Sequence, residues 1–138
     1  MRARSLVGVA LLMVGLGSGT LAAGDAGRRP SLQFAIVYIA VPTRIGSTIV
    51  QGPVLFTHDA AKMARGEPCT TVRLFEPAAG PIEEIAAFHC VTRRGAVTNR
   101  FTLTTRPNVA DGFGGVLTAY QFAGDWEVHG VPLTAMTH

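Results

Sequence analysis

Apolar and polar positions alternate over short stretches along most of the chain. Residues 32–41 are rich in β-branched and aromatic side chains and end at Pro42, which predicts a first, well-buried strand. Residues 47–56 are also β-prone, but Gly52 and Pro53 interrupt them, so we expect two short strands with a bend or bulge between them. Turn-forming residues separate the remaining strand candidates, which are 69–75, 82–92, 97–105, 116–123 and 126–128.

One helical segment interrupts this series of strands, at residues 59–66. Asp59 is a good capping residue, helix formers follow it, and Gly66 stands where a helix commonly ends. The chain shows no alternation of strands with long helices and no internal repeat. The pattern therefore predicts an all-β, mainly antiparallel fold, a small sandwich or barrel with one short helix.

The first residues have the pattern of an export signal. Arg2 and Arg4 precede an apolar run from Leu6 to Leu16, and small residues follow as far as Gly24. A membrane-spanning helix needs roughly 20 strongly apolar residues, and glycines dilute this run before that length is reached. We therefore expect a cleaved signal, no stable membrane anchor after cleavage, and a periplasmic or extracellular location.

This expectation divides the chain into a signal peptide at 1–23, a flexible lead-in at 24–30 and a single β-rich domain at 31–138. The full chain has a net charge of +3. Since the signal contains Arg2 and Arg4 but no acid, its removal lowers the net charge to about +1. A balance so close to neutral gives no reason to expect a nucleic-acid partner, and no other partner can be inferred.

Both cysteines, Cys69 and Cys90, lie in the predicted mature domain. Two cysteines in an oxidising compartment are most simply read as one disulfide. A hairpin turning at residues 76–81 would place them almost opposite each other. Closing a loop of this length would stabilise the fold by about 3 kcal/mol.

The alternative is a metal site, copper or haem, in which both cysteines stay reduced. The candidate ligands are His89, His129, Met63 and His58, because imidazole and thioether groups bind copper. Their spacing matches no known metal motif such as C-x-x-C or H-x-x-x-H. Strand alternation would also direct His89 and Cys90 to opposite faces of a strand. The principal expectation is therefore a protein without a cofactor.

Motifs for catalysis are also missing from the sequence. It contains no Gly-x-Ser-x-Gly, no glycine-rich loop before a helix and no cysteine-protease signature. His89 beside Cys90 in the sequence does not make a catalytic pair, since neighbouring strand residues point apart. We expect a binding or structural role, and we lean against an enzyme.

Three segments carry a resemblance to a known group of proteins. They are Lys62–Thr70 (KMARGEPCT), Phe88–Cys90 (FHC), and Phe122–Gly124 (FAG) followed by His129–Pro132 (HGVP). Together they resemble small exported bacterial proteins of unassigned function, over roughly residues 56–132. The resemblance implies no activity, cofactor or partner. It implies that the segment from Met63 to Cys69, the Phe88–Cys90 segment and His129 meet in space, around a disulfide or around a buried ligand.

Overall fold

The structure is a computed structural model that describes residues 30–108 and 114–133. The predicted signal peptide, and the lead-in up to residue 29, lie outside the described residues. The described elements are β1 (Leu32–Ile45), β2 (Thr48–Asp59), α1 (Ala60–Ala64), β3 (Thr70–Glu76), β4 (Gly80–Phe88), β5 (Val91–Arg94), β6 (Thr102–Arg106), β7 (Gly115–Gln121) and β8 (Glu127–Gly130). The all-β prediction with one short helix is confirmed. That helix, α1, is too short to span a bilayer.

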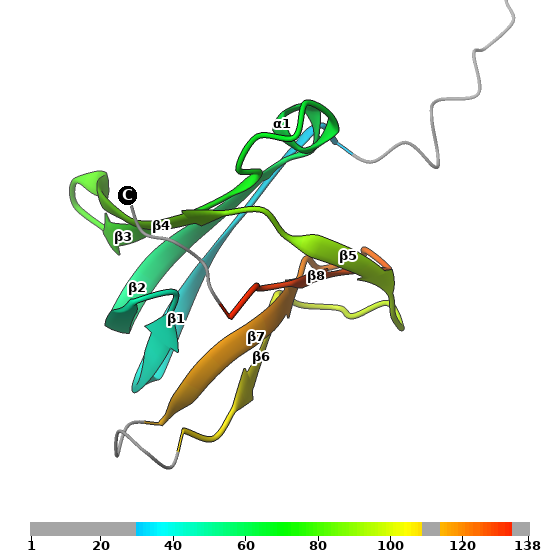
Figure 1. Ribbon diagram of the computed structural model, residues 1–138. Helices are drawn as coiled ribbons and strands as arrows, with labels where there is room; N and C mark the ends of the chain where they lie inside the picture. Colours follow the sequence, from blue (N-terminus) through cyan, green and yellow to red (C-terminus); the bar gives the residue numbers. More distant parts are fainter. Residues whose placement is uncertain (1–29, 109–113, 134–138) are drawn as a thin grey trace, which may run out of the picture.

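All the strands belong to one curled sheet that forms a half-barrel (Figure 1). Hydrogen bonds link the strands in the order β4-β3-β2-β1-β7-β8-β5, and β6 pairs with the other edge of β7. Every strand pair is antiparallel except β1 with β7, which run parallel at the pairs Thr43–Gly115 and Arg44–Val116. The chain crosses from one side of the half-barrel to the other between β4 and β5 (Figure 1).

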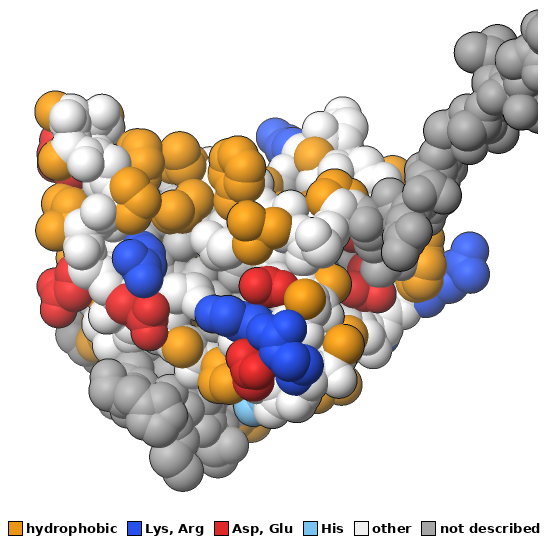
Figure 2. Space-filling model, turned by 90° about the horizontal axis from the view of Figure 1, so that it is seen from above, with side chains coloured by type: hydrophobic (Ala, Val, Ile, Leu, Met, Phe, Trp, Pro, Cys, Tyr) orange, Lys and Arg blue, Asp and Glu red, His pale blue; other side chains and the backbone are white. Residues whose placement is uncertain are grey.

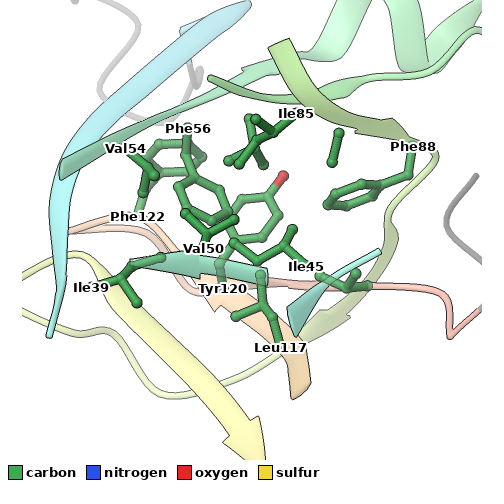
Figure 3. Close-up of a cluster of buried hydrophobic side chains, with 13 residues drawn as sticks. Ile39, Ile45, Val50, Val54, Phe56, Ile85, Phe88, Leu117, Tyr120 and Phe122 are labelled. Carbon is green, nitrogen blue, oxygen red and sulfur yellow. The ribbon is translucent and has the colours of Figure 1, made fainter. Parts of the chain in front are cut away.

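The concave side of the sheet holds the hydrophobic core (Figure 3). Alternation along β2 points Val54 and Phe56 inward, and β3 adds Val72 in the same way. Tyr120 of β7 lies in the middle of the cluster and packs against Phe56, with ring centroids 5.3 Å apart. Because the sheet curls, its own strands cover these side chains, as a second layer would in a sandwich.

The predicted break at Gly52 and Pro53 is absent from β2, because both residues pair regularly with β1. The irregularity lies in β1, where residues 40–42 stand opposite Gln51 alone. Gly52 has a φ of 98°, a conformation that favours glycine. The strand β2 nevertheless continues on both sides and lies between β1 and β3, so the expectation of two separate strands was too strong.

The prediction of a well-buried first strand was wrong for the outer face of β1. The side chains Leu32, Phe34, Ile36 and Tyr38 on the outer face of β1 are between 52% and 70% exposed. The cause is the single-sheet architecture, since no second layer of described residues covers the convex side. Figure 2 shows hydrophobic side chains gathered at the surface of the molecule beside charged ones.

The stretch predicted as one strand from 82 to 92 is divided in two. The strand β4 ends at Phe88, and β5 begins at Val91 and pairs with β8 on the other side of the half-barrel. His89 and Cys90 form the crossing between them. Because Cys90 lies outside both strands, its side chain is not bound to the opposite face from His89. It lies close to side chains of β2 and β8.

Candidate metal centre

Four potential metal ligands from distant parts of the sequence meet near the crossing between β4 and β5. His58 is near the end of β2, Cys69 immediately precedes β3, Cys90 follows β4 and His129 lies on β8. His58 and His129 are 2% and 0% exposed, and Cys69 is 2% exposed. Cys90 is partly exposed. We call these four residues the Cys2His2 cluster.

Local backbone structure explains why His58 and Cys69 are neighbours. His58 continues the inward-facing series of Val54 and Phe56, so its side chain enters the core. The chain then forms α1 and returns to the sheet at Cys69. The amide of Asp59 donates a hydrogen bond to the carbonyl of Cys69 at 2.9 Å. In the register of β2 with β3, His58 lies opposite Thr70. The start of β3 therefore sets Cys69 beside His58.

The two cysteines are brought together by the hairpin of β3 and β4. Thr70 pairs with Phe88, so Cys69, one residue before Thr70, and Cys90, two residues after Phe88, fall near each other. Their Sγ atoms are 3.2 Å apart, and the Cys90 amide donates to the Cys69 sulfur at 3.3 Å. Both thiols are free in the structure, and 3.2 Å is well beyond the 2.03–2.05 Å of a disulfide bond.

His129 completes the cluster from the opposite side of the half-barrel. Its Nδ1 atom lies 3.4 Å from the Sγ atom of Cys90, and its ring centroid lies 4.3 Å from that of His58. The Tyr120 ring stacks on the imidazole of His129, with 8° between the planes. The Tyr120 hydroxyl is in turn hydrogen-bonded to Thr70. Packing and hydrogen bonding therefore fix the orientation of His129.

One nitrogen of each imidazole in the cluster has no protein partner in the part of the chain that the structure describes. Within the described residues, the Nε2 atoms of His58 and His129 are buried and have no hydrogen-bond partner. The Glu127 carboxylate is 3.9 Å from the Nε2 atom of His129, too far for a hydrogen bond. A buried polar atom without a partner costs about 1–3 kcal/mol. A cost of this kind in two adjacent histidines calls for an explanation, and a bound ligand is one.

The electrostatics of the cluster favour a thiolate at Cys69 and a neutral imidazole at His129. The hydrogen bond from Cys90 and the nearby His58 imidazole lower the pKa of Cys69, although burial opposes this. The same hydrogen bond, burial and the charge on Cys69 raise the pKa of Cys90. Burial, and secondarily the proximity of His58, lower the pKa of His129 to about 4. A neutral imidazole and a thiolate are the forms that bind metal ions.

The distances in the cluster are close to those around a tetrahedral metal ion. One donor atom each from His58, Cys69 and Cys90 lies within 4.8 Å of the others. Two thiolates on a tetrahedral zinc ion lie about 3.8 Å apart, and a thiolate and an imidazole nitrogen about 3.6 Å apart. The observed separations of 3.2 Å between the sulfurs and 3.4 Å from sulfur to nitrogen are slightly shorter. A small outward movement of the side chains would admit the ion.

Of the four predicted metal ligands, the structure brings two into the cluster and leaves two outside. His58 and His129 belong to it. His89 is exposed at the crossing and lies outside the group of converging donors, and Met63 is 38% exposed on α1. Cys69 and Cys90 are the other two potential ligands in the cluster. His58 could have been given more weight from the sequence, because it continues the alternation of Val54 and Phe56.

Comparisons with known proteins add no further information on this site. No family model, curated protein or solved structure matches the chain.

Proposed function

We propose that this protein is an exported β-domain that binds one soft metal ion, Zn²⁺ or Cu⁺, through the Cys2His2 cluster. The observation that carries the proposal is the convergence of donor atoms from His58, Cys69 and Cys90, with the buried imidazole of His129 3.4 Å from the Cys90 sulfur. Thiolate and imidazole donors suit both ions. With four protein ligands, no coordination position remains for a substrate, which favours a structural or metal-holding role over catalysis.

The proposed export is compatible with metal binding by the two cysteines. The N-terminal pattern of a basic start and an apolar run supports secretion. In an oxidising compartment, two adjacent free thiols persist most readily when a metal ion occupies them. Export and metal binding therefore support each other, and each can be measured separately.

Metal binding is tested by titrating reduced, metal-free protein with Zn²⁺, with Cu⁺ under a reductant, and with Co²⁺ as a coloured substitute for zinc. We expect one ion per chain and, for Co²⁺, the intense absorption of tetrahedral thiolate coordination. Cys69→Ser and His58→Ala should weaken binding by more than about 100-fold, beyond the effect of outer-shell groups. The matched control is His89→Ala, which should bind normally.

Two results would overturn the metal proposal. The first is a reduced wild-type protein that takes up none of the three ions. The second is equal binding by wild type and Cys69→Ser, because the ion would then be held elsewhere.

A structural disulfide between Cys69 and Cys90 is the second candidate role of this cluster. It is favoured by the Sγ separation of 3.2 Å and by the hairpin that holds both residues. Closing the loop would stabilise the domain by about 3 kcal/mol. Counting thiols in the exported protein, before and after reduction, distinguishes a disulfide-bonded protein from a metal-bound one.

A further inference from the structure

We infer that the metal centre is controlled by oxidation: formation of a Cys69–Cys90 disulfide ejects the ion, and reduction restores the site. This inference rests on the proposed metal binding and adds the way in which that binding is regulated. Metal binding and disulfide formation by the two cysteines are then the reduced and the oxidised state of one site.

The sulfurs are already placed for bond formation. They are 3.2 Å apart, so a disulfide requires an approach of about 1.2 Å. The β3–β4 hairpin fixes both backbones through the Thr70–Phe88 pair, and the Cys90 amide donates to the Cys69 sulfur. Side-chain rotation is sufficient for this approach. The sheet can keep its register in both states.

The ion cannot stay when the bond forms. The thiolate is the ligand form of cysteine, and a disulfide removes both thiolates at once. Only His58 and His129 would remain, and two imidazoles make a much weaker site. Oxidation should therefore release one ion for each disulfide formed.

Unequal exposure sets the order of the chemical steps. Cys90 is partly exposed, whereas Cys69 is 2% exposed. In the metal-bound site both cysteines are thiolates, so exposure decides which reacts first. The Cys90 sulfur attacks a small-molecule disulfide, whose sulfur–sulfur bond breaks and releases one small thiolate. The Cys69 sulfur then attacks the Cys90 sulfur, forms the internal disulfide and displaces the second small thiolate. The cysteines lose two electrons, the small disulfide gains them, and the ion passes to a chelator.

The experiment uses the full mature chain loaded with Zn²⁺, oxidised glutathione as the oxidant and a coloured zinc chelator in solution. Released zinc and remaining thiols are followed together, and mass spectrometry reports the disulfide. We expect one zinc ion released for every two thiols lost, and recovery of binding after reduction. Retention of zinc after the disulfide has formed would overturn the inference, as would zinc-loaded thiols that resist oxidation completely.

The same measurements separate this inference from the proposed function. If the reduced chain binds no zinc but still forms the disulfide, the metal proposal fails and the redox control fails with it. If the reduced chain binds zinc but oxidation does not release it, only the redox control fails.

Two cysteine variants test the order of attack. Reduced Cys69→Ser should accumulate a mixed disulfide with glutathione on Cys90, while Cys90→Ser should react at least tenfold more slowly. If a variant does not fold, brief oxidation of the metal-free wild type, followed by peptide mapping, locates the first adduct. An adduct mainly on Cys69 would contradict the proposed order.

Discussion

His58 occupies a position at which an apolar side chain would normally pack. It follows Val54 and Phe56 on the inner face of β2, it is 2% exposed, and its Nε2 atom has no partner within the described structure. A residue retained at such a cost is better explained by a ligand than by packing. The same argument applies to His129, which is fully buried.

This argument predicts that His58→Leu makes the metal-free protein more stable by about 1 kcal/mol, because it removes the unpartnered nitrogen. The same variant should lose metal binding. Denaturant unfolding of the reduced, chelator-treated protein measures the change in the free energy of unfolding. The control His89→Leu alters an exposed residue and should change it by less than about 0.5 kcal/mol. Clear destabilisation by His58→Leu would indicate a histidine that serves packing.

At the scale of elements, the short parallel pairing of β1 with β7 joins the two parts of the half-barrel at a corner. Gly115 pairs with Thr43 there and has a φ of 155°. A Cβ atom at this position would lie 2.9 Å from the carbonyl oxygen of Arg106, which belongs to the backbone of β6. The close approach of these strands therefore requires glycine.

We expect Gly115→Ala to reduce the free energy of unfolding by about 1–3 kcal/mol, since the backbone of β6 or β7 must move. Urea unfolding measures this loss. The comparison variant is Gly80→Asn in the β3–β4 turn, where φ is 82° and no atom lies within 4 Å of an added Cβ. Asparagine tolerates that conformation, so the cost should be well below that of Gly115→Ala. Equal costs would show that crowding at the corner is unimportant.

Local patterns in the sequence predicted where the strands and the helix lie better than they predicted which strands pair. The cap at Asp59 and the glycine at Gly66 enclose α1 as expected, and the turn at 76–81 forms the β3–β4 hairpin. The break at His89 and Cys90 was not predicted, because residues 82–92 keep a strand-like composition. It depends on the pairing of β5 with β8, a long-range contact that local patterns do not encode.

The candidate site was predicted in part for the same reason. The proximity of Cys69 and Cys90 follows from the hairpin and could be expected from the sequence. The positions of His58 and His129 beside them depend on the curl of the whole sheet. The sequence-based hypothesis placed His89 beside His129 and ahead of His58, although His89 is exposed at the crossing.

On the scale of the whole molecule, an ion in the Cys2His2 cluster would connect both sides of the half-barrel. It would link the end of β2 and the start of β3 to the β4–β5 crossing and to β8. In this small single-sheet domain, a bound ion would stabilise the folded state, since the unfolded chain has no preformed site. The metal centre would thus add support at the end of the half-barrel away from the β1–β7 corner.

The most direct test of this account is X-ray absorption spectroscopy at the zinc edge, on reduced protein loaded with one equivalent of Zn²⁺. We expect four ligands, with two sulfurs at about 2.3 Å and two nitrogens at about 2.0–2.1 Å. His58→Leu should lose a nitrogen ligand, while His89→Ala should leave the spectrum unchanged. A first shell containing only oxygen and nitrogen would contradict the account, because the cysteine pair at its centre would then take no part in binding the ion.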